Sequence, residues 1–394
     1  MAESTSRPIA LTDLGCEPFR SLFPSAVLAG ILGAAVWPLH FAGWGGYPAL
    51  THARLMTAGF FGGFIFGFLG TALPRMLSAP PLGTGNVLLL TALHLGMGVA
   101  FATGNLAWGD HLFLVLLLGF VTLMVLRIGQ RKDTPPPGFV LAGLGFLCVG
   151  TGAVLAVLQH YYEDMGSSWV FLQRLLGYQG FVLLPILGVG PFLLPRFFGQ
   201  RSRHDFPEML TPTAPWLRKA ALAFVAGAAL ILSFFVEVWG SQRLAYGIRL
   251  AATAGYLFLE FPWRLGTGPG RGLGRALQAA FVALIGAWLI LTLFPTYRTA
   301  LLHLALIGGF AGVTVVAGAW VVHGHSGQLD RFKLRHRWLV VTLVLFWVAM
   351  LTRISGDLWP AVMISHYIYA ALLLIAGLLL WAIFVLPKIL RIDE

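Results

Sequence analysis

The chain has 394 residues, of which 58% are hydrophobic and 10% are charged, and its mean hydropathy is +0.82. No water-soluble core of this size requires such a composition, so we expect the lipid bilayer to be the solvent. The formal net charge of +11 does not indicate nucleic-acid binding, because the Lys and Arg residues stand in short loops between apolar runs. The two cysteines, Cys16 and Cys148, are too few for a disulfide scaffold or a zinc site.

Apolar runs of about 20 residues follow one another with short polar breaks, which predicts an all-α, polytopic membrane bundle of about twelve transmembrane helices. We expect one transmembrane domain over residues 21–387, a cytoplasmic N-terminal segment at 1–20 and a cytoplasmic tail at 388–394. The expected spans are 22–43, 55–74, 86–104, 108–127, 138–159, 169–195, 216–237, 244–262, 276–294, 301–322, 338–354 and 361–386.

The basic residues predict the orientation of the bundle. Most of the 26 Lys and Arg residues fall in alternate loops, and loop cations are retained in the cytoplasm. Both termini should therefore be cytoplasmic, which requires an even number of spans. We expect no cleaved signal peptide, because no basic region leads directly into an apolar stretch and a small-residue cleavage site.

A weak internal repeat links the second, sixth and tenth spans. The segment from Gly59 to Arg75 can be laid over the segment from Gly180 to Arg196 at an offset of 121 residues. An offset of 250 residues brings Gly309 onto Gly59 and His325 onto Arg75. Three four-helix units would account for twelve spans. The alternative is a shared packing demand, since small residues let membrane helices approach closely.

The eleven histidines are the first candidates for chemistry, because ionisable groups inside a bilayer are costly and are functional candidates by default. Haem iron in a six-coordinate site takes a neutral imidazole from each face of the ring, so two helices must present a histidine at matching depth. His52 and His303 open the second and tenth spans and meet this condition. Alternatively, either histidine anchors a helix end at the interface. The outer ends of the expected spans hold His40, His52, His111, His160, His303 and His366.

Several side chains near these histidines suit the same cofactor. Met56 lies one turn from His52, where its thioether would serve copper or haem, or simply fill space. Arg54 and Arg353 are cations that haem propionates would neutralise. Alternatively, both side chains extend along their helices to place the guanidinium at the outer membrane surface. His366 is a candidate second ligand or proton carrier, although an interfacial aromatic belt explains its tyrosine neighbours equally well.

Other candidate groups are weaker. His323 and His325 stand two residues apart in an expected cytoplasmic loop and could together coordinate a copper or zinc ion. Two ligands alone make a weak site. Glu237 and Glu260 lie inside or at the ends of expected spans and are candidates to relay protons, with pairing to Arg243 or Arg264 as the alternative. No Ser-His-Asp, paired-carboxylate or phosphate-loop pattern stands out, so hydrolysis and ATP-driven transport are poorly supported.

The segment His52-Ala53-Arg54-Leu55-Met56 resembles the NnrS family of haem- and copper-containing membrane proteins linked to nitric oxide. The resemblance extends over nearly the whole chain and includes Gly59-Phe60, Gly67 to Pro74, Pro18-Phe19-Arg20, Pro195-Arg196-Phe197, Leu302-His303 and Gly324-His325-Ser326-Gly327. The family usually shows His-Ala-His-Glu-Met where this chain has Arg54 and Leu55. If the missing histidine binds metal in relatives, we expect this member to bind less metal or to carry out different chemistry.

The resemblance implies a multi-pass protein of the bacterial cytoplasmic (inner) membrane that binds haem b, with copper as a second cofactor, and that acts in tolerance of nitric oxide. His52, Met56, His303 and His325 carry over as ligand candidates. One alternative is an enzyme, a quinol-linked nitric oxide reductase. Another is a transporter without a cofactor, because Gly/Pro-interrupted spans can line a midplane site. Twelve spans in three units also resemble the catalytic subunit of haem-copper oxidases, whose adjacent His-His pair this chain lacks.

Overall fold

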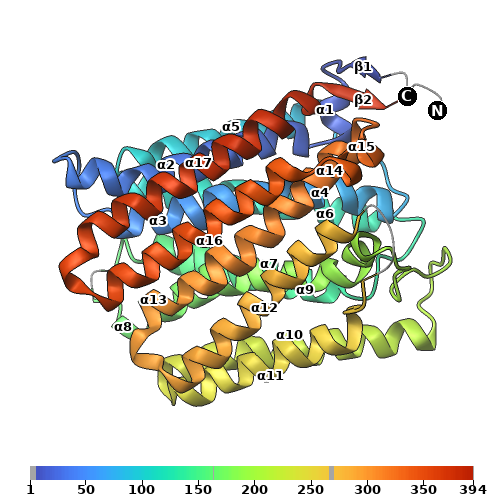
Figure 1. Ribbon diagram of the computed structural model, residues 1–394. Coiled ribbons are helices and arrows are strands. Elements are labelled where there is room, and N and C mark those ends of the chain that lie inside the picture. Colours follow the sequence, from blue (N-terminus) through green and yellow to red (C-terminus); the bar gives the residue numbers. More distant parts are fainter. Residues whose placement is uncertain (1–5, 163, 266–269, 394) are drawn as a thin grey trace.

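A computed structural model describes residues 6–162, 164–265 and 270–393 as a bundle of long helices (Figure 1). The first five residues of the expected N-terminal segment and the last residue of the expected tail lie outside the described residues. In chain order, with η for π- and 3-10 helices, the elements are β1 (Ser6–Pro8), α1 (Asp13–Cys16), α2 (Phe19–Phe41), α3 (Ala49–Arg54), η1 (Leu55–Phe61), α4 (Gly62–Met76), α5 (Thr84–Ala102), α6 (Leu106–Gly129), α7 (Phe139–Leu158), α8 (Ser167–Arg174), η2 (Leu175–Gly180), α9 (Phe181–Leu193), η3 (Leu194–Phe198), α10 (Ala214–Trp239), α11 (Gln242–Glu260), α12 (Arg271–Leu293), η4 (Pro295–Tyr297), α13 (Arg298–His303), η5 (Leu304–Ala311), α14 (Gly312–His325), α15 (Leu329–Leu334), α16 (Arg337–Leu358), η6 (Pro360–Val362), α17 (Met363–Ile389) and β2 (Arg391–Asp393).

The two described chain ends lie at the same end of the bundle, where β1 pairs antiparallel with β2 (Figure 1). Arg20, near the start of α2, donates hydrogen bonds to the carbonyl oxygens of Ile389 and Arg391 and so joins the first long helix to the last. We call this the termini end, and the opposite end, which carries α3, α8 and α13, the histidine end. A chain whose ends meet must cross the bundle an even number of times.

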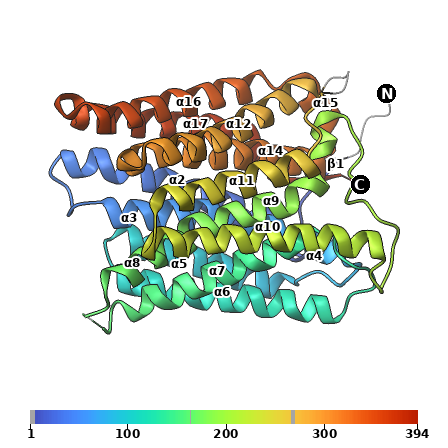
Figure 2. The same cartoon turned by 90° about the horizontal axis from the view of Figure 1, so that it is seen from below.

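Among the described residues, eleven helices or runs of consecutive helices are long and apolar enough to cross a membrane. Helix α11 is a further long helix, and Arg243, Arg249 and Glu260 make it less apolar than the others. It lies beside α10 and α12 along the bundle (Figures 1 and 2). Its 19 residues extend over about 28 Å, nearly the thickness of a bilayer core. With α11 the crossings are even, and the prediction of an all-α membrane bundle of about twelve helices is confirmed.

The outer surface and the interior of the bundle are both apolar. Leu118, Val125 and Leu147 are each more than half exposed, as expected for side chains that face lipid rather than water. Inside, Trp288 and Trp381 are fully buried. Charged and polar side chains therefore lie mainly at the two ends of the bundle and in a few buried networks. A functional site is expected at one of these places.

Each of the three spans in the expected repeat contains a π-helical segment: η1, η2 and η5. A π turn holds an extra residue and widens the helix locally, and it is frequent at functional sites. A Cβ atom on Gly59 would lie 2.7 Å from Cβ of Ala29, and one on Gly180 would lie 3.0 Å from Cβ of Cys148. The equivalent glycines thus let a neighbouring helix approach closely. A repeat predicts such π segments at equivalent positions in the three spans. All three segments lie toward the histidine end of their spans.

Candidate functional site

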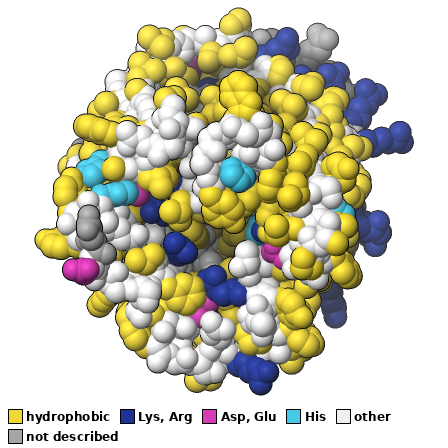
Figure 3. All heavy atoms as spheres, turned by 90° about the vertical axis from the view of Figure 1, so that its left-hand side faces the viewer, with side chains coloured by type: hydrophobic (Ala, Val, Ile, Leu, Met, Phe, Trp, Pro, Cys, Tyr) yellow, Lys and Arg dark blue, Asp and Glu magenta, His cyan; other side chains and the backbone are white. Residues whose placement is uncertain are grey.

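His52 and His303 line one cavity at the histidine end. The cavity has a volume of about 200 Å³ and lies between α2, α3, η1, η2, α13, η5, α16 and α17. Its other ionisable lining residues are Arg353, Tyr178 and Tyr367, and most of the remaining wall is alkyl or aromatic. Figure 3 views the molecule from this end and shows basic, acidic and histidine side chains around a central hollow within a hydrophobic rim. Residues far apart in the sequence therefore meet in one space.

Both imidazoles in the cavity are held through Nδ1. His52 Nδ1 lies 2.7 Å from the carbonyl oxygen of Gly33, and His303 Nδ1 lies 2.8 Å from that of Thr299. Because a carbonyl oxygen only accepts, Nδ1 donates in each case, and the neutral ring keeps its lone pair on Nε2. Neither Nε2 has a hydrogen-bond partner in the part of the chain that the structure describes. A metal-ligating histidine is commonly fixed in this way.

Arg353 brings positive charge to the cavity wall. Its guanidinium lies 2.7 Å from the Asp357 carboxylate and 3.8 Å from the centroid of the Tyr367 ring, and its side chain is only 11% exposed. The Tyr367 hydroxyl donates to the same carboxylate. Trp37 packs against both Tyr367 and His52, with ring centroids 5.0 and 6.0 Å apart. Arg353 is thus held at the cavity by packing and does not extend to the outer surface.

Arg54 is not among the residues that line the cavity. Its Nε lies 2.7 Å from Asp110 Oδ1, and its Nη1 donates to the Tyr178 hydroxyl at 2.5 Å. His160 Nε2 lies 3.0 Å from the other oxygen of Asp110. Arg54 therefore reaches the cavity only through the phenol of Tyr178, and its charge is neutralised by a carboxylate of the protein. The sequence reasoning missed Asp110, although an acid inside the apolar run after residue 105 was a detectable signal.

The remaining candidates at this end divide into two groups. Met56 lines the same cavity as His52, so its thioether lies within the candidate site. His366 does not line the cavity. Its Nδ1 forms a hydrogen bond with Ser355 Oγ at 2.7 Å. The next residue, Tyr367, lines the cavity instead. Consecutive residues of an α-helix point about 100° apart, so one position decides which face a side chain occupies.

His323 and His325 lie close together at the end of α14 but line different pockets. The His323 ring stacks on Phe332 with a centroid distance of 4.3 Å. His325 Nδ1 lies 2.5 Å from a carboxylate oxygen of Glu17, which Arg75 also contacts at 2.6 Å. Within the described ranges, no group of three or more His, Cys, Asp and Glu side chains could hold a metal ion. His323 and His325 therefore do not face one common space in this structure.

Glu17 connects the elements at the termini end. Burial alone would raise the pKa of its carboxyl, but hydrogen bonds and charge from His325, Arg75 and Arg20 lower that pKa from 4.5 to about 2. The carboxylate is therefore ionised at neutral pH. It joins the start of α2 to the ends of α4 and α14 through Arg20, Arg75 and His325.

Glu237 belongs to a buried network rather than to the cavity. It accepts hydrogen bonds from Arg249 Nη2 at 2.7 Å, Arg298 Nε at 2.8 Å and the Tyr246 hydroxyl at 2.8 Å. Arg249 is fully buried and also donates to Gln179 in η2 at 2.9 Å. Glu237 does pair with arginine, but its partners are Arg249 of α11 and Arg298 of α13 and not the expected Arg243. With its hydrogen bonds satisfied, the network favours a structural role.

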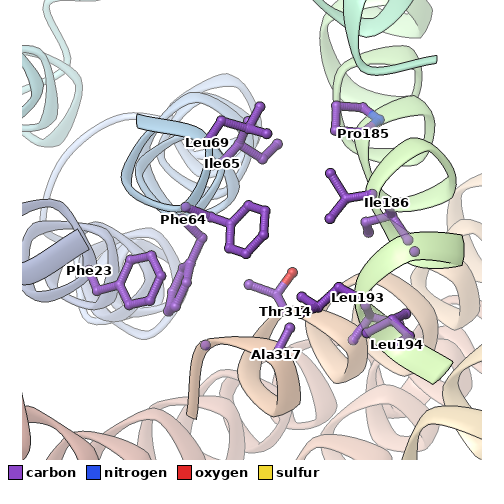
Figure 4. Close-up of a pocket in the computed structure, with 15 residues that line it drawn as sticks. Phe23, Phe64, Ile65, Leu69, Pro185, Ile186, Leu193, Leu194, Thr314 and Ala317 are labelled. Atoms are coloured by element: carbon purple, nitrogen blue, oxygen red, sulfur yellow. The ribbon is translucent and has the colours of Figure 1, made fainter. Parts of the chain in front are cut away.

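A second cavity, of about 90 Å³, lies deeper in the bundle between α2, α4, α9 and α14. In Figure 4, Phe64, Ile186 and Thr314 extend toward this space from three different helices. Its lining is apolar except for the hydroxyl of Thr314. Phe60 lines the histidine cavity, and its ring lies 5.2 Å from that of Phe64, which lines the apolar cavity. A layer of aromatic rings thus separates the two spaces.

A third pocket continues this row toward the termini end. It has a volume of about 610 Å³ and is lined by Arg75, Arg196 and His325, among others. These three residues occupy equivalent positions in the expected repeat. Three spaces therefore follow one another between the three related spans, from the histidine end to the termini end.

The family described as NnrS protein matches residues 14–392, nearly the whole chain. A search among curated proteins found no match. The matched range contains every transmembrane helix and all the residues that line the histidine cavity. The chain therefore belongs to the NnrS family.

Proposed function

We propose that this protein binds haem b in the histidine cavity, with His52 and His303 as axial ligands, and acts in the response to nitric oxide or in its detoxification. Family membership supports a multi-pass membrane protein linked to nitric oxide. The haem assignment rests on one observation, two neutral imidazoles on one cavity, each fixed through Nδ1 with Nε2 free. Histidine is the common haem ligand, and a backbone carbonyl is a usual partner for its second nitrogen.

The other lining residues suit the same group. Arg353 differs from Arg54 in lining the cavity itself; Asp357 already neutralises its charge, so a carboxylate such as a haem propionate would use further N–H groups of the same guanidinium. The alkyl and aromatic walls exclude water from a flat, mostly apolar molecule. When bound, the haem iron would supply a redox centre and a coordination position for nitric oxide or another diatomic ligand. Met56 remains a soft donor at the cavity wall.

We also propose that the termini end faces the cytoplasm of a bacterial inner membrane, because most loop cations lie at this end. The histidine cavity then lies near the periplasmic side. Enzymatic turnover of nitric oxide would further require an electron donor such as a quinol. Copper is a weaker expectation, since the paired Arg54 occupies a position where relatives usually have a histidine.

A transporter without a cofactor is the second candidate. It is favoured by the row of three spaces between the related spans, which continues from one end of the bundle to the other. Transporter sites typically lie near the bilayer midplane between repeats. The apolar space in the middle of this row would suit an uncharged substrate.

The test is an optical spectrum of detergent-purified protein, oxidised, reduced and exposed to nitric oxide, with iron and copper measured on the same sample. We expect a haem spectrum that changes with nitric oxide. His52→Ala and His303→Ala should each lower haem content or change the spectrum. His366→Ala is the matched control, because it lies at the same end but outside the cavity, and should leave the spectrum unchanged. A colourless, iron-free protein expressed with adequate haem would favour the transporter.

A further inference from the structure

A pocket of about 570 Å³ lies at the termini end between α14, α15, α16 and α17. We call it the cation pocket. Figure 1 places α15 at the same end as β1 and β2, far from α3 and α13, which carry the axial histidines. The cation pocket is therefore separate from the proposed haem site. Its basic lining residues come from three helices and a loop: Arg331, Arg335, Arg337 and Lys388.

The four cations of this pocket have no counter-charge. Within residues 6–162, 164–265 and 270–393, none of them makes an ion pair or a side-chain hydrogen bond. A neighbouring cation is paired, because Lys333 lies 2.9 Å from Asp330. Four like charges around one space repel one another and create a positive potential inside it. The missing component is an anion.

The floor and the rim of the cation pocket are apolar. The His323 ring stacks on Phe332, and the Trp338 ring lies parallel to that of Phe384 with a centroid distance of 5.3 Å. Leu334, which also lines the pocket, is 71% exposed. Exposed apolar side chains continue from the pocket along α16 and α17: Val340, Val341, Val344 and Ile383. A soluble anion would use only the cations, whereas a lipid would use the cations and this apolar surface together.

We propose that the cation pocket binds the phosphate headgroup of an anionic phospholipid, whose acyl chains lie along α16 and α17. Arginine suits this ligand because its planar guanidinium forms paired hydrogen bonds with phosphate oxygens. Basic pockets between transmembrane helices are known to accept such headgroups at the cytoplasmic face. The site needs no haem, so it stands or falls independently of the histidine cavity.

The test is native mass spectrometry of the full-length protein titrated with phosphatidylglycerol or with phosphatidylcholine. We expect one retained phosphatidylglycerol molecule and much weaker binding of phosphatidylcholine. The triple variant Arg331→Gln/Arg335→Gln/Lys388→Gln should bind phosphatidylglycerol about a hundredfold more weakly, since each basic residue near an anionic headgroup contributes about fivefold. Binding of phosphatidylcholine should not change.

The matched control removes the same charge elsewhere at the termini end. The triple variant Arg131→Gln/Lys132→Gln/Arg218→Gln alters three exposed cations outside the pocket, two in the loop after α6 and one in the first turns of α10. Its affinity for phosphatidylglycerol should stay within about twofold of the unmodified protein, because the surface potential falls off within a Debye length. Equal losses in the two triple variants would mean that net charge attracts the lipid, which overturns the proposal.

Two further measurements keep the result interpretable. If the pocket triple variant does not fold, Arg335→Gln alone removes one exposed, unpaired cation and should still weaken binding by about fivefold. A competition series with inorganic phosphate distinguishes the source of the phosphate group. Displacement of the lipid at equal concentrations of inorganic phosphate would assign the pocket to a soluble anion and overturn the lipid assignment.

Discussion

Replacing Glu237 with Gln should lower the free energy of unfolding by about 3–5 kcal/mol, because it leaves two guanidinium groups without their counter-charge. Arg249 and Arg298 lie 2.7 and 2.8 Å from the Glu237 carboxylate, and the side chain of Arg249 is fully buried. Gln has nearly the size of Glu, so the loss reports charge and not a cavity. Equilibrium unfolding in mixed detergent micelles, followed by circular dichroism, measures this difference.

The control for this prediction is Asp330→Asn. Asp330 pairs with Lys333 at 2.9 Å, but its side chain is 93% exposed, and an exposed pair contributes at most about 1 kcal/mol. Combining Glu237→Gln with Arg249→Met should cost less than the sum of the single changes, since the second change removes a charge that the first leaves unpaired. If Glu237→Gln cost no more than Asp330→Asn, the network would not stabilise the fold and the reasoning would be refuted.

Three other predictions concern the termini end, the apolar cavity and the helix contacts. The lowered pKa of Glu17 contributes about 3 kcal/mol above pH 4.5, which is lost as the pH falls toward 2, so Glu17→Gln should flatten the acid limb of a stability-against-pH curve. Xenon should occupy the apolar cavity in crystals under pressure, and Thr314→Leu should exclude it. Gly59→Ala should destabilise the protein by about 1–3 kcal/mol because its Cβ would meet Ala29 at 2.7 Å, whereas Gly255→Ala, in open space, should be neutral or stabilising in the same unfolding assay.

The sequence was sufficient for the fold class because a bilayer imposes a length and a polarity on each span. Helix α11 was expected as the span 244–262 even though Arg249 and Glu260 lower its hydropathy, and tertiary contacts neutralise both charges. That His52 and His303 lie on one cavity was predictable from their depth and their positions in the expected repeat. The exclusion of His366 and Arg54 from the cavity was not, because a face assignment needs the rotation of each helix to within one residue, and a π turn shifts that rotation.

The three related spans do not contribute equally to the cavity, and this asymmetry indicates where a flat cofactor would lie. The first and third copies each bring a histidine just before their π segments, His52 before η1 and His303 before η5. The helix before η2 in the second copy, α8, contains no histidine, and η2 contributes Tyr178 to the cavity instead. Its neighbour Gln179 binds Arg249 of the buried network. One copy thus belongs to the buried network while the other two bring histidines to the cavity, and these two copies are the ones that would hold the proposed haem.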